Sequence, residues 1–223
     1  MGTTRLIAVV LTVLIGLTSC SRDPNVVKKR YLESGNKYFE KGRYKEASIQ
    51  FRNALKRDPK FGAAHYKLAL VALKTNDYGA AVGSLRRAIE LIPPDQPDHW
   101  EAIVRLTEIY LAVAKGEKVY MDEVEKWTQD LLKRDSNSYD AHRLIGDLNF
   151  SRAITAYKDK KNDEGQVFLT TSIEEYKRAD SIKPGQQGVS MQLARALAAK
   201  GDFAGAEALY RSGQSVAVGH ISG

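Results

Sequence analysis

Residues 31–59, YLESGNKYFEKGRYKEASIQFRNALKRDP, contain a pattern that returns 34 residues further along the chain. Lys41–Ala47 aligns with Thr75–Ala81 at that shift. Phe51 then meets Leu85, Ala54 meets Ala88 and Pro59 meets Pro93. The pattern returns in part near the C-terminus, as Lys200–Ala206. Self-similarity at a period of roughly 20–50 residues indicates stacked structural repeats.

The residue types within the repeat favour pairs of antiparallel helices. Small residues such as Gly35 and Ala47 allow two helices to approach closely, with aromatic side chains filling the space beside them. Gly42 and Asn76 tolerate the left-handed backbone of a tight turn, and a following Asp can cap the next helix. A proline such as Pro59 ends a helix because it lacks the amide donor. The sequence therefore predicts an all-α fold.

The pattern closely resembles the tetratricopeptide repeat. The first copy has signature residues at Tyr31, Gly35, Tyr38, Ala47, Phe51, Ala54 and Pro59, and departs from it at Ser34; the second keeps Leu68, Ala81, Leu85, Ala88 and Pro93. The resemblance implies a right-handed solenoid of helical hairpins, an α-α superhelix. It also implies that the first helix of each hairpin lines the concave face.

We expect helices at 26–41 and 44–57, 61–75 and 78–91, 98–114 and 119–133, 138–158 and 164–182, and 187–199 and 202–212. Residues 28–95 would form two regular repeats, and 96–137 a degenerate one with an expanded turn around Lys115–Lys118. Residues 138–186 would form an elongated repeat with a charged turn at Lys158–Gly165, its extra helical turns projecting beyond the solenoid. Residues 187–223 would form an incomplete repeat with a non-helical tail at Ser212–Gly223.

The N-terminus predicts export and lipidation. Arg5 precedes the apolar run Leu6–Leu17, which is too short for a membrane span and typical of a signal peptide. Leu17–Cys20 resembles the bacterial lipobox, which implies a signal peptide at 1–19, a covalent lipid on Cys20 and a lipidated linker at 20–27. The alternative is an uncleaved signal anchor. Ser21 after the cysteine favours the outer over the inner membrane.

Composition argues against several function classes. The net charge is +7 without a block of Lys and Arg, which disfavours nucleic acid as a partner. The chain has no HExxH, phosphate loop or nucleophile elbow, and its four histidines are scattered. We therefore expect no enzyme activity, no catalytic residue, no metal, no small-molecule substrate and no cofactor apart from the lipid. His65, His142, Trp100 and Trp127 are interpreted as packing residues.

A partner would then bind in the concave groove, through side chains one turn apart on the first helices. The predicted groove residues are Asn36, Phe39, Tyr66, Lys67, Leu70 and Leu73. A carboxylate clamp is incomplete, because Leu32 stands where such clamps carry a cation and Lys67 where they carry an Asn. An apolar and aromatic groove for a peptide segment is expected instead.

The start of the mature chain resembles the tetratricopeptide lipoproteins of bacterial exopolysaccharide and exosortase (PEP-CTERM) systems. That resemblance implies a periplasm-facing scaffold, anchored in the cell envelope, that assists assembly or export of surface polysaccharide or sorted proteins. Two alternatives are a pilus or secretin assembly lipoprotein and an outer-membrane barrel assembly lipoprotein. An alternative of another class is an accessory domain of a periplasmic enzyme.

Overall fold

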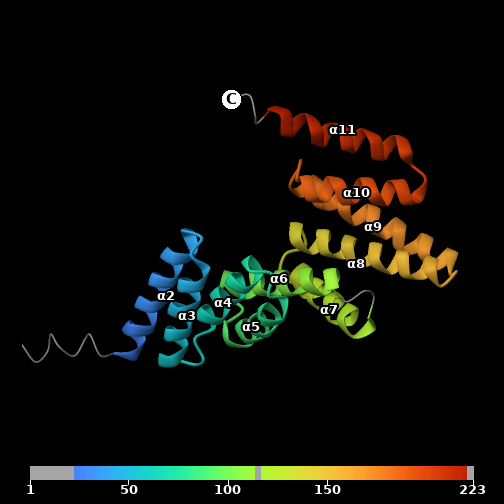
Figure 1. Ribbon diagram of the computed structural model, residues 1–223. Helices are drawn as coiled ribbons and strands as arrows, with labels where there is room; N and C mark the ends of the chain where they lie inside the picture. Colours follow the sequence, from blue (N-terminus) through green and yellow to red (C-terminus); the bar gives the residue numbers. More distant parts are fainter. Residues whose placement is uncertain (1–22, 114–116, 220–223) are drawn as a thin grey trace, which may run out of the picture. The chain divides into compact units, whose positions relative to one another are not determined.

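A computed structural model describes residues 23–113 and 117–219, with side chains described up to Arg211 (Figure 1). Within these ranges the chain forms ten α-helices and no strand. None of these helices has both the length and the apolar character to cross a bilayer. The chain divides into two compact units at Leu106 and Thr107, and each is described by itself.

The first unit is built from two helical hairpins and the first part of a third. Its helices are α2 (Pro24–Glu40), α3 (Tyr44–Arg57), α4 (Gly62–Lys74), α5 (Tyr78–Leu91) and, up to Leu106, α6 (Pro97–Val113). Helix α2 packs against α3, α4 against α5, and α3 against α4. Buried Ala47, Phe51 and Val71 form a core cluster covered by half-buried side chains such as Leu32 and Tyr38.

The predicted turn chemistry between paired helices is confirmed. Gly42 and Asn76 have φ values of 70° and 57°, the left-handed region that Gly and Asn tolerate. Asp77 caps α5 by accepting a hydrogen bond from the Ala80 amide at 3.0 Å. In the long hairpin the corresponding left-handed residue is Lys160, at φ 60°.

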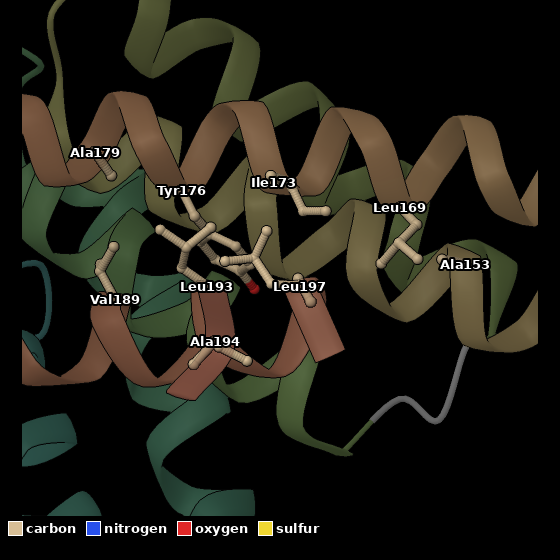
Figure 2. Close-up of a cluster of buried hydrophobic side chains, with 11 residues drawn as sticks. Ala153, Leu169, Ile173, Tyr176, Ala179, Val189, Leu193, Ala194 and Leu197 are labelled. Carbon is tan, nitrogen blue, oxygen red and sulfur yellow. The ribbon is translucent and has the colours of Figure 1, made fainter. Parts of the chain in front are cut away.

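The second unit continues the arrangement with longer helices. It contains the end of α6 and α7 (Lys118–Arg134), α8 (Tyr139–Lys158), α9 (Asn162–Ile182), α10 (Gln187–Lys200) and α11 (Phe203–Gly219). Each helix from α7 to α10 packs against the next one in the chain. Figure 2 shows Tyr176 and Ile173 of α9 between α8 and α10, in a cluster that also contains Leu169 and Leu193.

Three expected segments differ from the observed ones, while the other helix ends lie within two residues of their expected positions. Residues 24–27 of the expected linker form the first turn of α2, because Asp23 accepts a hydrogen bond from the Asn25 amide at 2.8 Å and Pro24 occupies a position where a helix needs no donor. The expected non-helical tail at Ser212–Gly223 is wrong over 212–219, since α11 continues to Gly219, and residues 220–223 lie outside the described residues. One mid-helix glycine, Gly213, costs only about 1 kcal/mol and does not end a helix by itself.

The third difference concerns the long hairpin. Its turn is restricted to residues 159–161, because α9 already begins at Asn162. Gly165 therefore lies within α9, where a Cβ would meet Tyr157 Cε1 at 2.7 Å. The extra turns pack on one another, with Ala153 and Leu169 fully buried. The close approach of the two helices holds the extension together.

Candidate functional site

The groove residues predicted in the first unit lie on α2 and α4, and five of the six are half-buried: Asn36, Phe39, Lys67, Leu70 and Leu73. Phe39 packs on the core of the first hairpin, with its ring 5.4 Å from that of Tyr44 in an edge-on arrangement. Lys67 lies over the ring of Tyr66 at 5.3 Å. These contacts pack Phe39 and Lys67 against neighbouring side chains, and their part in binding stays a prediction.

Tyr66 was predicted to line the groove, but its side chain is buried. Its side chain is only 2% exposed, and its hydroxyl donates a hydrogen bond to Glu101 Oε2 at 2.5 Å. Burial and this hydrogen bond raise the pKa of the Tyr66 hydroxyl. Tyr66 is therefore a core residue that joins α4 to α6, because its ring is removed from water while its hydroxyl keeps a hydrogen-bond partner.

The other predicted site residue, Cys20, lies outside the described residues.

The histidines interpreted as packing residues differ in their surroundings. His142 is 3% exposed, with Nδ1 2.6 Å from Glu175 Oε2 and Nε2 3.0 Å from the Ser136 carbonyl oxygen. His65 is half-buried against the Pro59 carbonyl oxygen at 3.0 Å. Trp127 stacks on Tyr110 with ring centroids 5.8 Å apart.

A hollow of about 620 Å³ lies within the second unit, on the first helices of three successive hairpins. This groove of the second unit is lined by Glu108, Leu111 and Ala112 of α6, Arg143, Asp147, Phe150, Ser151, Ile154, Thr155 and Lys158 of α8, and Gln192 of α10. The resemblance to the tetratricopeptide repeat implies that first helices line the concave face, and stacked repeats use such faces for binding. The groove thus has the position expected of a binding site, but in the second unit.

One end of the groove is a network centred on Arg143. Its guanidinium donates to Glu108 Oε1 at 2.6 Å and lies 3.6 Å from Asp147 Oδ2 and 3.5 Å from Asp140 Oδ1. Burial opposes the charge on Arg143, but the carboxylates around it outweigh that effect and raise the pKa of the guanidinium. Three carboxylates surround one cation, so this end of the groove is net acidic.

Asp147 is held in place by hydrogen bonds from two other helices, α9 and α10. Tyr176, fully buried on α9, donates its hydroxyl hydrogen bond to Asp147 Oδ1 at 2.7 Å, and Gln192 Nε2 donates to the same oxygen at 3.3 Å. Burial raises the pKa of the Asp147 carboxyl, against the hydrogen bond from Tyr176 and the charge of Arg143, which lower it. Burial also raises the pKa of the Tyr176 hydroxyl. These bonds fix the carboxylate where a ligand would meet it.

The rest of the groove mixes apolar and polar side chains. Its apolar residues, which we call the apolar floor, are Leu111, Ala112, Phe150 and Ile154, and the Ile154 side chain is 36% exposed. Ser151, Thr155 and Lys158 line the groove beside them. The guanidinium of Arg195 lies 5.6 Å from the centre of the Phe150 ring, within the range of a cation–π attraction. An apolar floor beside fixed charges suits a peptide that inserts apolar side chains and places a polar group at one end.

The α8 residues of the groove were missed, although the sequence carries a signal for them. Arg143, Asp147, Phe150, Ile154 and Lys158 follow one another at spacings of four, three, four and four residues, which places them on one face of a helix. Charged residues stand at both ends of that face, with two apolar residues between them, so it does not resemble a core stripe. The contributions of Glu108 and Gln192 have no such signal, because they come from other hairpins.

No His, Cys, Asp and Glu side chains within 23–113 and 117–219 form a group of three or more suited to a metal ion. Among the polar groups of the groove, Glu108, Arg143, Asp147 and Gln192 are held by the bonds described above, which suits them to binding a ligand.

Comparisons with known proteins agree with the architecture. Residues 32–96 match the tetratricopeptide repeat family. A search of the curated proteins finds no match. Among solved structures, MamA residues 41 to the end from Desulfovibrio magneticus RS-1 superimposes with a TM-score of 0.63 at 17% identity, over 87% of this chain and 97% of that one.

Two further structures give similar results. PilF of Pseudomonas aeruginosa has a TM-score of 0.60 at 16% identity, over 87% of this chain and 78% of that one. A thermophilic tetratricopeptide protein of Thermus thermophilus has a TM-score of 0.56 at 20% identity, over 84% and 90%. At such identities the likeness concerns the fold. The chain thus has an all-α, tetratricopeptide-type solenoid fold, and its residues 32–96 carry that family's sequence repeat.

Proposed function

We propose that this protein is a scaffold of the cell envelope, anchored by a lipid on Cys20 and facing the periplasm, that holds a peptide segment of another protein in the groove of the second unit. The observation that carries the proposal is the 620 Å³ groove across three first helices, with an apolar floor and a fixed acidic end. The tetratricopeptide-type fold supports a role in protein–protein interaction. The anchor rests on the lipobox resemblance of Leu17–Cys20.

The partner that we propose belongs to the machinery that assembles or exports surface polysaccharide or sorted proteins. This follows from the resemblance of the early mature chain to exopolysaccharide and exosortase lipoproteins. The competing partners are proteins of secretin assembly and proteins of outer-membrane barrel assembly. A periplasmic hydrolase in the groove would indicate the accessory-domain alternative. Each choice predicts a different protein at the same surface.

Site-specific photocrosslinking from Ile154 tests the groove. The full precursor would be expressed in a Gram-negative host with a photoreactive amino acid at Ile154, and crosslinked proteins would be identified by mass spectrometry. The matched control position is Val167, which is 65% exposed on α9 and does not line the groove. We expect a specific crosslink from Ile154, absent from Val167 and weakened by Phe150→Ala. Equal crosslinking from both positions would refute the groove as the binding site.

Lipidation is tested separately in the same cells. We expect the precursor to incorporate a labelled fatty acid and the Cys20→Ser variant to incorporate none. A free Cys20 thiol in the membrane-bound protein would remove the anchor from the proposal and leave the groove to be judged by crosslinking alone.

A further inference from the structure

The positive charge of this protein is concentrated in its first hairpin. Residues 23–60 contain eleven Lys and Arg against five Asp and Glu. Residues 107–223, by contrast, contain sixteen Lys and Arg against seventeen Asp and Glu. The overall excess of +7 therefore comes mainly from one part of the chain and is not spread evenly over it.

The start of α2 and the end of α3 lie together at one end of this hairpin. Lys28 Nζ forms an ion pair with Asp58 Oδ2 at 2.7 Å, and the same ammonium lies 4.9 Å from the centre of the Phe61 ring. The pair joins the second turn of α2 to the residue that ends α3. Figure 1 shows the two helices running antiparallel, as this contact requires.

Five exposed cations surround that junction: Lys29 and Arg30 on α2, Lys56 and Arg57 on α3, and Lys60 in the following turn. We call these five residues the basic end. None of them forms an ion pair among the described residues.

The acidic groups at this end are already engaged. Lys28, with help from the Lys60 amide, lowers the pKa of the Asp58 carboxyl. Asp23 caps α2. The local field of the basic end is therefore positive.

The second hairpin has no such cluster at the matching end. A Cβ on Gly62 would meet Ile92 Cγ1 at 2.6 Å, so the start of α4 and the end of α5 also lie together. The residues that follow are Asp95 and Asp98. The cations thus mark the end of the first hairpin, and the repeat does not require them.

We propose that the basic end rests on an anionic lipid surface and forms a second attachment beside the N-terminal anchor. The proposal rests on the anchoring proposed above. Cys20 precedes Pro24 by four residues, which span at most about 14 Å when extended. An anchored chain would hold these cations close to the headgroups, where counter-ions screen charges over only about 8 Å.

Electrostatic attraction would complement the anchor energetically. A Lys or Arg near an anionic bilayer contributes about 1 kcal/mol, and stable attachment to membranes commonly combines acyl chains with a polybasic patch. The nearly neutral second unit gains little from the same surface.

Lysine acetylation in defined vesicles tests the proposal on the full chain. The protein, residues 1–22 included, would be reconstituted into phosphatidylcholine alone or mixed with phosphatidylglycerol, and flotation would establish attachment in both. We expect acetylation of Lys29, Lys56 and Lys60 to slow about fivefold in the anionic mixture, the factor that about 1 kcal/mol corresponds to. Exposed Lys126 and Lys177 of the second unit should react equally in both lipids, and high salt should remove the difference.

A charge variant makes the test specific. Combined Lys56→Gln, Arg57→Gln and Lys60→Gln should restore fast acetylation of Lys29, whereas Lys126→Gln with Lys177→Gln should not. Equal reactivity of the basic end in both lipids would overturn the proposal, as would protection that arises only on adding envelope proteins, which would assign this end to an acidic protein. Loss of flotation in both lipids would overturn the anchoring as well. A failed crosslink from Ile154 would leave this result unchanged, because no partner protein is present.

Discussion

Gly146 of α8 lies against the ring of Tyr176 so closely that a Cβ on Gly146 would come within 2.6 Å of Tyr176 Cδ1. Gly35 of α2 makes the same kind of contact with the ring of Phe51 on α3. The first hairpin separates the two residues by 16 positions and the long hairpin by 30. The long hairpin thus keeps the contact between glycine and aromatic ring that sets the spacing of its helices, and adds its extra turns beyond it.

Gly146→Ala should destabilise the second unit by about 1–3 kcal/mol, because the added methyl group overpacks a close contact. Gly83→Ala is the matched control: Gly83 lies inside α5 with nothing within 4 Å of a Cβ, so alanine should stabilise by about 0.5–1 kcal/mol. Urea unfolding can be followed through Trp127 in a Trp100→Phe background for the first variant, and through Trp100 in a Trp127→Phe background for the second. A Gly146→Ala protein as stable as its parent would show that the hairpin spacing relaxes freely.

Lys160→Gly should stabilise the second unit by about 1 kcal/mol, because Lys160 has a left-handed backbone that costs a residue with a Cβ about 1–2 kcal/mol. Lys158→Gly, two residues earlier in the last turn of α8, should destabilise instead. Urea unfolding followed through Trp127 compares the two. Stabilisation by both substitutions would mean that the loss of charge, not the backbone, is responsible.

Tyr66→Phe should cost the first unit about 0.5–1.5 kcal/mol, because it removes the hydrogen bond to Glu101 from a buried ring. Tyr66→Ala should cost about 3–5 kcal/mol, as expected for a large buried side chain. Unfolding followed through Trp100 measures both, and Tyr78→Phe, at a ring that is 49% exposed, should change little. If Tyr66→Ala weakened partner capture at unchanged stability, the ring would be a binding residue after all.

Two carboxyl groups should give stability changes of opposite sign with pH. The Asp147 pKa is raised above its ordinary value of 3.8. The folding stability that this group contributes is therefore present below pH 3.8 and is lost as the pH rises through the raised pKa. The Asp58 pKa is lowered, so the folding stability that this group contributes is present above pH 3.8 and is lost as the pH falls through the lowered pKa.

Asp147→Asn should therefore gain stability relative to the wild type as the pH rises above about 4, and Asp58→Asn should lose stability relative to the wild type as the pH rises towards 4. Denaturant unfolding between acidic and neutral pH, followed through Trp127 and Trp100 respectively, measures the two differences. Parallel curves for both variants and the wild type would contradict the assigned directions.

Ile154→Glu should abolish partner capture in the groove and leave the unfolding of the second unit nearly unchanged, because the side chain is 36% exposed and its substitution buries no charge in the core. The expected loss is at least tenfold in crosslinked or co-purified partner, since a carboxylate would enter the apolar floor beside an already acidic end. Val167→Glu on the outer side of α9 should retain capture. Equal effects of the two substitutions would indicate non-specific loss of binding.

The helices of this protein were largely predictable from local sequence. Gly42, Asn76 and Asp77 specify turns, Pro59 and Pro93 follow helix ends, and the 34-residue repeat supplies the phase. These signals act over a few residues and need no knowledge of the remaining chain. The one long departure, α11, lies where the local pattern is weakest.

The candidate site, in contrast, was decided by tertiary contacts. The groove requires Glu108, Arg143 and Gln192, which are far apart in sequence and meet only when three hairpins stack. The buried Tyr66 hydroxyl likewise finds its hydrogen-bond acceptor, Glu101, only on the next hairpin. Sequence alone determined the all-α repeat and its helix limits because short-range chemistry specifies turns and caps. The tertiary structure alone decided which faces are covered and which stay open, because that depends on neighbours brought together by packing.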